Sequence, residues 1–225
     1  YFFDGVNTVA KYNGTVVSTV AAIPKGTNAA WFHNLLFIFG VSGAPNDIRI
    51  SDLGNPENHS TGIATTISIN PNDGDYITAF GQLNDELIVF KSQRVWSITG
   101  FGTTTLTVSD LNEKITGFGT IAPRSVVNTG NDLLYLSFIG DVPHIRSLKR
   151  TSFATVVDGG IISENIETTM KGLNKSALSS VASVYDGKNL WVAVADGSTT
   201  FNNKVIMRDM ETEGWVRHSG INASC

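Results

Sequence analysis

The sequence predicts an all-β fold that is built from repeated antiparallel sheets. Dense apolar runs, each preceded by turn residues, begin at Leu35, Leu87, Leu133 and Leu190, so successive copies lie 52, 46 and 57 residues apart. Consecutive apolar positions in these runs indicate strands that are buried on both faces. Such burial is typical of a β-propeller, in which each sheet lies between neighbouring sheets. We therefore expect a β-propeller-like fold with about five blades of short antiparallel strands.

The clearest copy is the stretch Asp73–Gly100. An Asp-Gly turn at its start leads into a strand at Tyr76–Phe80. Asn84 and Asp85 then supply residues that tolerate positive φ, and two short β-prone runs follow at Leu87–Phe90 and Val95–Ile98.

The other copies are expected to share this order of strands. One strand precedes each apolar run, at Ala29–Phe32, Ile77–Phe80, Ser125–Val127 and Val181–Tyr185, and one follows it, at Asp47–Ser51, Arg94–Thr99, His144–Leu148 and Val205–Arg208. Variable fourth strands, such as Thr103–Val108 and Trp215–His218, complete the blades. Two N-terminal strands, Val9–Tyr12 and Thr15–Ala21, would make a further partial or complete blade around the turn Asn13-Gly14.

One short helix is expected at Ser163–Leu173, in the link between the third and fourth copies. Ser163 can cap the free N–H groups, and Ile166, Met170 and Leu173 lie on one helical face. Such a helix either fills a longer link between blades or contacts a partner subunit.

The length allows one large all-β domain or two small ones, and we expect a single propeller-like domain over residues 1–225. A hydrophobic content of 41% is enough for a core, and 22 glycines with few charges suit many turns. The net charge of −4 argues against a surface that grips DNA or an anionic membrane. Apolar runs are far shorter than the about 20 residues of a membrane span. Because the chain begins at Tyr1 rather than Met, we expect a processed product or a piece of a larger protein.

The sequence contains no pattern that predicts catalysis, cofactor binding or metal binding. The histidines have no zinc-site spacing, no Gly-x-Ser-x-Gly elbow is present, and the single cysteine is the last residue. We therefore expect no enzyme, no cofactor and no catalytic or metal-ligating residue. The histidines are His33, His59, His144 and His218, and the cysteine is Cys225.

Two other patterns leave alternatives open. The segment Asn70–Asp75 is crowded with oxygen-bearing side chains, so it is either a plain turn or a cation site at Asp73 and Asp75. Four tryptophans could stack sugars, but Trp96 and Trp191 lie inside apolar runs, which favours core or inter-blade packing. The full set is Trp31, Trp96, Trp191 and Trp215, and the sequons at Asn13, Asn58, Asn174 and Asn222 are expected by chance in a Ser/Thr-rich chain.

Several segments between about residues 47 and 150 resemble propeller-bearing structural proteins of tailed bacteriophages. They are RISDLGNP (Arg49–Pro56), DGDYITA (Asp73–Ala79), LIVFK (Leu87–Lys91), VWSITG (Val95–Gly100), GFGTIAPRSV (Gly117–Val126) and NDLLYLS (Asn131–Ser137). In that family a Gly-containing turn follows the Leu-Ser step. Here Phe138–Asp141 is displaced by one residue.

The resemblance implies a structural subunit of a phage tail or neck, such as a nozzle, tail-tube or hub protein, located in the tail of the virion. It further implies a hexameric ring of copies around the DNA path, contacts with neighbouring tail proteins, and DNA that passes without specific binding. Blade edges and the long links at residues 40–47, 54–75 and 157–174 are the expected contacts. One alternative is a carbohydrate- or receptor-binding propeller on a host-recognition fibre, which exposed aromatic residues on one rim would favour. The other alternative is a secreted glycosidase, which would need converging carboxylates.

Overall fold

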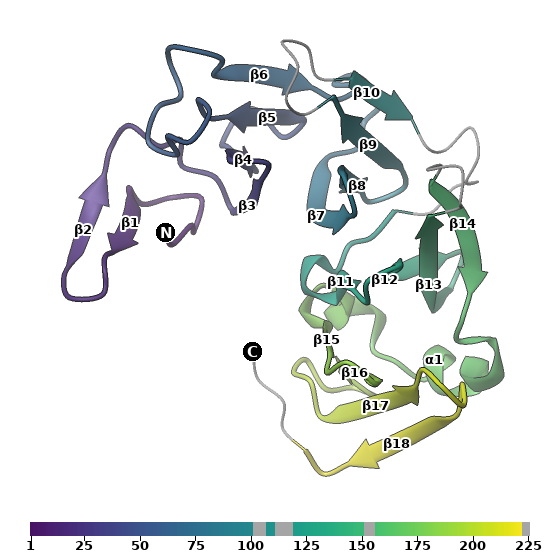
Figure 1. Ribbon diagram of the computed structural model, residues 1–225. Coiled ribbons are helices and arrows are strands. Elements are labelled where there is room, and N and C mark those ends of the chain that lie inside the picture. Colours follow the sequence, from purple (N-terminus) through teal and green to yellow (C-terminus); the bar gives the residue numbers. More distant parts are fainter. Residues whose placement is uncertain (101–106, 111–118, 151–155, 222–225) are drawn as a thin grey trace. The chain divides into compact units, whose positions relative to one another are not determined.

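The computed structural model describes residues 1–100, 107–110, 119–150 and 156–221 (Figure 1). The chain divides into two compact units, which are described separately: unit 1 comprises Tyr1–Ile77 and Ile98–Val108, and unit 2 comprises Thr78–Ser97 and Ser109–Cys225. The single domain expected over residues 1–225 stays a prediction. Among the described residues, no helix has the length and apolarity needed to cross a membrane.

The described residues form five antiparallel sheets that follow one another along the chain, and the strand order within each sheet follows the sequence (Figure 1). The first has two strands and the other four have four strands each. The sheets are β1 (Val9–Tyr12) and β2 (Val17–Val20); β3 (Asn28–Phe32), β4 (Leu35–Phe39), β5 (Asp47–Ile50) and β6 (Thr65–Ser68); β7 (Ile77–Leu83), β8 (Glu86–Lys91), β9 (Val95–Thr99) and β10 (Thr107–Asp110); β11 (Val127–Asn128), β12 (Asp132–Ile139), β13 (Val142–Arg150) and β14 (Val156–Ile161); and β15 (Ala182–Tyr185), β16 (Asn189–Val194), β17 (Lys204–Asp209) and β18 (Trp215–Ser219).

This arrangement confirms the predicted fold class: all-β and propeller-like, with blade-sized antiparallel sheets and one short helix in a link. The first sheet is a partial blade, in which Phe2 bridges to Ala10 beside the β1–β2 pair. Strands β6 and β14 were not predicted, and they lie inside two of the links that the sequence indicated as irregular. The expected fourth strand Thr103–Val108 lies largely outside the described residues.

The repeated apolar runs form the second strand of each four-stranded sheet, where each is paired on both edges. Strands β4 and β8 are buried at every position, and β12 is buried from Leu133 to Ser137. The turn before β8 has the expected backbone, with Asn84 at φ 53°. Two-sided apolarity therefore predicted burial correctly for three of the four runs.

The fourth run, β16, differs from the other three. Its even-numbered residues Leu190, Val192 and Val194 are buried in the main core of unit 2, whereas Trp191 and Ala193 are only half-buried. The prediction that both faces of this strand are buried is thus wrong. An apolar side chain does not itself specify whether a second sheet covers it.

The helix is shorter than predicted. A 3-10 turn at Glu164–Ile166 precedes α1 (Glu167–Lys171), and the expected apolar face does pack into the core of unit 2 through Met170. Ser163 makes no side-chain cap. Its hydroxyl is fully buried and instead accepts a hydrogen bond of 3.0 Å from the backbone N–H of Ile145 in β13.

The same use of a buried serine recurs at two other places. The hydroxyl of Ser51 accepts from the N–H of Leu36 at 2.9 Å, and that of Ser125 accepts from the N–H of Leu136 at 3.0 Å. Ser125 was expected in a strand, but it ends a 3-10 turn that begins at Pro123. A buried N–H without a partner is costly, so these hydroxyls stabilise strand positions that the ladder leaves unpaired.

Candidate interaction surfaces

Exposed apolar side chains are concentrated in unit 1. Among the described residues, ten of the fourteen large hydrophobic side chains that are exposed belong to this unit, although it is the smaller one. Where such side chains lie next to one another, exposed apolar surface is typical of an interaction site. The ten are Tyr1, Phe2, Val6, Tyr12, Val16, Val17, Trp31, Leu53, Ile63 and Tyr76.

Part of this surface is a hollow of about 470 Å³ beside β3, which we call the aromatic hollow. Leu36 lies directly opposite Trp31 in the β3–β4 ladder, so both side chains are on one face of the sheet. Buried Leu36 and half-buried Ala29 belong to the core of unit 1 and form the floor. The full lining is Tyr1, Phe2, Phe3, Thr27, Asn28, Ala29, Trp31 and Leu36.

One wall of the hollow is fixed by polar contacts. The hydroxyl of Tyr1 donates to Oε1 of Glu57 at 2.9 Å, and Nζ of Lys11 lies 2.5 Å from the same oxygen. Hydrogen bonding to Lys11 lowers the pKa of Glu57, and Glu57 in turn raises the pKa of Lys11. The charges of Lys11 and Glu57 beside the hollow therefore pair with each other.

Glu57 belongs to the link between β5 and β6, which was predicted to carry contacts. This link is held by Asp52, whose Oδ1 accepts from the N–H of Ile63 at 3.0 Å and whose Oδ2 accepts from Asn58 at 3.3 Å. These hydrogen bonds hold the pKa of Asp52 below its ordinary value. The link thus presents exposed Leu53 and Ile63 from a hydrogen-bonded frame.

Unit 2 carries a second apolar surface, on the last sheet. Val184, Trp191, Met207 and Val216 pair in sequence across β15, β16, β17 and β18, so they form one row on one face. Val184 is 58% exposed and Val216 is 47% exposed, and the two central side chains are half-buried. We call this row, with the neighbouring His218, the C-terminal apolar face.

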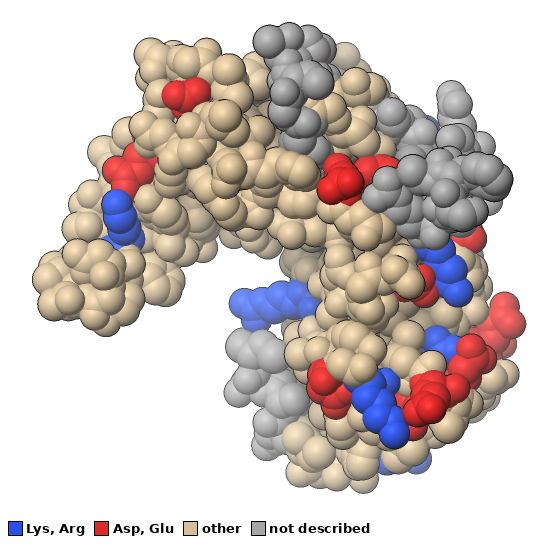
Figure 2. All heavy atoms as spheres, viewed as in Figure 1, with Lys and Arg blue, Asp and Glu red and all other residues tan. Residues whose placement is uncertain are grey.

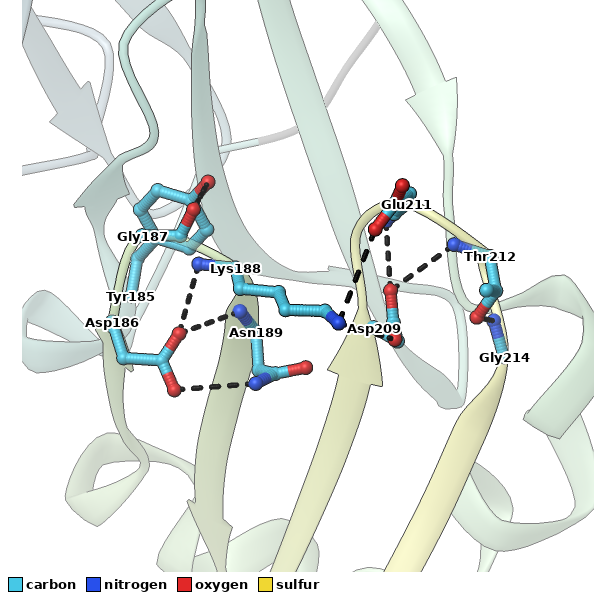
Figure 3. A network of polar contacts seen from close by, with 9 residues as sticks. All are labelled: Tyr185, Asp186, Gly187, Lys188, Asn189, Asp209, Glu211, Thr212 and Gly214. Atoms are coloured by element: carbon cyan, nitrogen blue, oxygen red, sulfur yellow. Dashed lines mark hydrogen bonds and ion pairs between the residues drawn. The ribbon is translucent and has the colours of Figure 1, made fainter.

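Trp191 is held in place within this face. Its ring stacks on that of His218 with centroids 5.9 Å apart, and its indole N–H donates to Oδ2 of Asp186 at 2.7 Å. Asp186 also accepts from two backbone N–H groups of its turn, and Lys188 bridges to Asp209 on the next turn at 4.0 Å (Figure 3). Trp191 and Trp96, for which core or inter-blade packing was expected, are each half-buried.

Charged groups in unit 2 are mixed in sign. Figure 2 shows Lys or Arg beside Asp or Glu on the face that it presents near α1 and β17. Ion pairs there include Lys171 with Glu167 at 2.5 Å and Lys188 with Glu211 at 3.9 Å. This part of the surface is not a basic patch of the kind that grips nucleic acid.

The four histidines lie on different elements. Burial lowers the pKa of His59 and of His144, and His33 sits at a turn with φ 47°. Within the described ranges, no three His, Cys, Asp or Glu side chains come together as metal ligands. Cys225 lies outside the described residues. The expected absence of catalytic, cofactor and metal sites stays a prediction.

The segment Asn70–Asp75 forms a turn before β7. Oδ1 of Asp73 accepts from the N–H of Asp75 at 3.0 Å, and Oδ2 accepts from the amide of Asn70 at 3.2 Å. Gly74 has a positive φ of 73°, as an Asp-Gly turn requires. The carboxylate thus has a structural use in the turn, and a cation at Asp73 and Asp75 stays untested.

No protein-family model and no curated protein matches the sequence. One chain of a solved structure of S. cerevisiae Dbp5 bound to Nup159, Gle1, IP6 and ADP matches 83% of this chain and 40% of its own length, with a TM-score of 0.44 and 10% identity. The crystal structure of the N-terminal domain of Nup159 matches 88% of this chain and 62% of its own length, with a TM-score of 0.33 and 9% identity. This chain thus spans less than two thirds of the length of either matched chain. Likenesses this weak carry no argument about function.

Proposed function

We propose that this chain is a structural subunit of a bacteriophage tail or neck, where copies assemble head to tail into a hexameric ring around the DNA path. The proposal starts from the resemblance of residues 47–150 to phage propeller proteins. The structural observation that supports it most is the C-terminal apolar face, an ordered sheet face whose row from Val184 to Val216 is left half-exposed. We therefore infer that the protein acts through its surfaces rather than through the chemistry of a site.

A closed ring requires two different patches on each subunit, because one heterologous contact repeats around the axis. Unit 1 and unit 2 each offer one. The first is the exposed set on the β1–β2 hairpin, with Tyr12, Val16 and Val17, and the second is the C-terminal apolar face. The hairpin tip carries no charged side chain from Tyr12 to Ala22, which suits contact with an apolar partner.

The net charge of −4 also fits this role, because a mildly acidic ring does not hold DNA that passes through it. The proposal includes the absence of catalysis. Turnover of a glycan panel that one Asp or Glu substitution abolishes would overturn that part.

Electron microscopy of the source particle tests the proposal. We expect density for this domain to repeat around the tail axis, with the C-terminal apolar face of one copy covered by unit 1 of the next. A single copy per particle, or a location unconnected with any virion, would overturn the structural role.

A matched pair of variants tests the contact itself. Val216→Lys places a charge on the C-terminal apolar face, whereas Arg217→Gln changes the neighbouring residue, which points to the other face of β18. We expect incorporation into particles to fall about tenfold or more for Val216→Lys and to stay unchanged for Arg217→Gln. Equal incorporation of both variants would exclude this face as the contact.

A further inference from the structure

We propose that the outer edge of β2 pairs antiparallel with the same edge of a second copy of this chain, so that two hairpins join into one four-stranded sheet. Four of the sheets already have four strands each, whereas the first has only β1 and β2 (Figure 1). A two-stranded sheet is marginally stable by itself. The inference does not rest on ring assembly, because it uses the backbone edge of the hairpin, whereas the proposed ring contact uses exposed side chains.

The hydrogen bonds of the first sheet show which backbone groups face outward. The N–H of Phe2 donates to the carbonyl oxygen of Ala10 at 2.8 Å, so the backbone groups of Ala10 point away from β2. Ala10 lies opposite Thr19 in the β1–β2 ladder, and pairs of this kind alternate with hydrogen-bonded pairs. The N–H and C=O of Thr19, and those of Val17 two residues earlier, therefore point away from β1 to the outer edge.

Nothing in the described parts of the chain covers these outward groups. Among the described residues, the N–H and C=O of Val17 and Thr19 make no hydrogen bond. The side chains of Val17, Ser18 and Thr19 are all exposed. An edge of this kind is a template for pairing with another strand unless charge or proline protects it.

The edge of β2 lacks the protection that the outer edges of the other sheets have. The outer strands β10, β14 and β18 each contain a charged residue, namely Asp110, Asp158 and Arg217. In β6 the hydroxyl of Ser68 donates to Oδ1 of Asp47 at 2.5 Å, so a charged group of β5 reaches that edge. By contrast, residues 13–22, which include β2, contain neither a charged side chain nor a proline.

One register lets two such edges satisfy each other. With Ser18 on the two-fold axis, Val17 of each copy pairs with the partner's Thr19, and each of these pairs exchanges two hydrogen bonds. Outward groups recur at every second residue, so any other register differs by at least two positions. A shift would need Thr15, whose N–H already donates to a side-chain amide of the hairpin turn at 3.0 Å, or Ala21, which lies in the turn after β2.

The side chains agree with this register. Val16 would lie opposite the partner's Val20, on the same face as Ser18, so apolar pairs flank the axis. No charged side chain of residues 13–22 would oppose another. The same patch meets itself, as a two-fold contact requires.

Cysteine cross-linking tests the register, in a Cys225→Ser background that removes the single native cysteine. Ser18→Cys would place two Cα atoms about 4.5 Å apart across the axis, within the range of a disulfide. Thr19→Cys would place them about 8–9 Å apart, and Val16→Cys farther still, so neither control can bridge. Under mild oxidation at about 0.1 mM chain, we expect Ser18→Cys to form disulfide dimers at least about tenfold faster than either control.

A second pair of variants tests the backbone contact. Thr19→Pro removes an N–H that faces outward and takes no part in the β1–β2 ladder, whereas Thr19→Ala removes the side chain and keeps the N–H. Because the edge is short, sedimentation of the parent should show a reversible dimer with a Kd on the order of 0.1 mM. Thr19→Pro should raise this Kd about tenfold or more, and Thr19→Ala less than about threefold.

A parent that stays monomeric at about 1 mM would overturn the proposal, and so would equal cross-linking of the three cysteine variants. Circular dichroism shows whether Thr19→Pro folds, and the cysteine series decides the matter if it does not. Head-to-tail contacts join two different patches, so a disulfide between two copies of residue 18 reports the pairing separately from the ring. If rings form in solution, Val216→Lys removes the ring contact and the same series is measured in that background.

Discussion

The indole N–H of Trp191 donates a hydrogen bond of 2.7 Å to Oδ2 of Asp186, which lies at the turn before the same strand. The carboxylate also accepts from the backbone N–H groups of Asn189 at 2.6 Å and Lys188 at 2.9 Å. These hydrogen bonds hold the pKa of Asp186 well below its ordinary value, and the bond from the backbone N–H of Asn189 has the largest effect. One carboxylate thereby fixes both a turn and the central ring of an exposed sheet face.

We expect Asp186→Asn to remove an acid-sensitive part of the stability. The folded-state pKa is depressed, so the carboxylate stabilises the fold fully above its ordinary pKa of 3.8, and this contribution is lost as the pH falls from there through the lowered value. In urea unfolding, the free energy of unfolding should fall more between pH 6 and pH 3 for the parent than for the variant. Asp141→Asn, at a side chain that is 92% exposed, is the control and should follow the parent. The same pH dependence in Asp186→Asn and the parent would contradict the assignment.

Val89→Asp should be among the most harmful single changes. Val89 is fully buried in β8, all of whose positions are buried, so an unpaired carboxylate there costs about 3–5 kcal/mol of unfolding free energy. Val6→Asp, at a position that is 73% exposed, should change the stability by less than about 0.5 kcal/mol. Chemical denaturation of both variants measures the difference, and similar midpoints would refute the burial of this strand.

The three buried serines whose hydroxyls accept a hydrogen bond from a strand N–H should each be necessary for full stability. Replacing Ser51, Ser125 or Ser163 by Ala leaves one strand N–H without an acceptor, at an expected cost of about 1–3 kcal/mol each. Ser60→Ala, at an exposed serine, is the control. Hydrogen exchange adds a local readout, because the N–H of Leu36, Leu136 or Ile145 should lose protection only in the matching variant. A uniform loss of protection would indicate a global effect instead.

Gly119→Ala should destabilise unit 2 strongly. An added Cβ would overlap the carbonyl oxygen of Lys91, which also accepts from the N–H of Thr120 at 3.0 Å. The backbone must therefore shift, and a fall in thermal midpoint of several degrees is expected. Gly214→Ala, where only the hydroxyl of Thr212 lies within 4 Å, is the matched control. A thermal midpoint for Gly119→Ala equal to that of the control would rule out this close approach.

Much of the fold could be predicted because its signals are local. Apolar runs such as Leu87–Phe90 identify interior strands, and turn residues such as Asn84 and Gly14 adopt the positive φ that their chemistry permits. Strands β6 and β14 were not predicted because they are edge strands whose residues lack a continuous apolar pattern. An edge strand buries less side-chain surface, so its sequence is less constrained.

The surfaces could not be predicted because they depend on what each side chain meets in space. Trp191 and Leu190 are equally apolar, yet only Leu190 is fully buried, and nothing in the strand distinguishes the two faces. The sequence predicts Ser163 as a helix cap. Its hydroxyl instead accepts a hydrogen bond from the N–H of Ile145, 18 positions earlier in the chain. Trp31 was identified in the sequence as a ring that could stack a sugar, but the hollow that it lines with Tyr1 was not predicted.

The half-exposed row from Val184 to Val216 also has a thermal consequence. Covering apolar surface is driven near room temperature mainly by the entropy of water, so such contacts weaken on cooling and strengthen in sulfate. A ring closed through this face would therefore be cold-labile: chilled, low-salt solutions should hold separate subunits, and warming should restore the assembly without any ligand. Handling temperature would then decide which species a biochemist isolates.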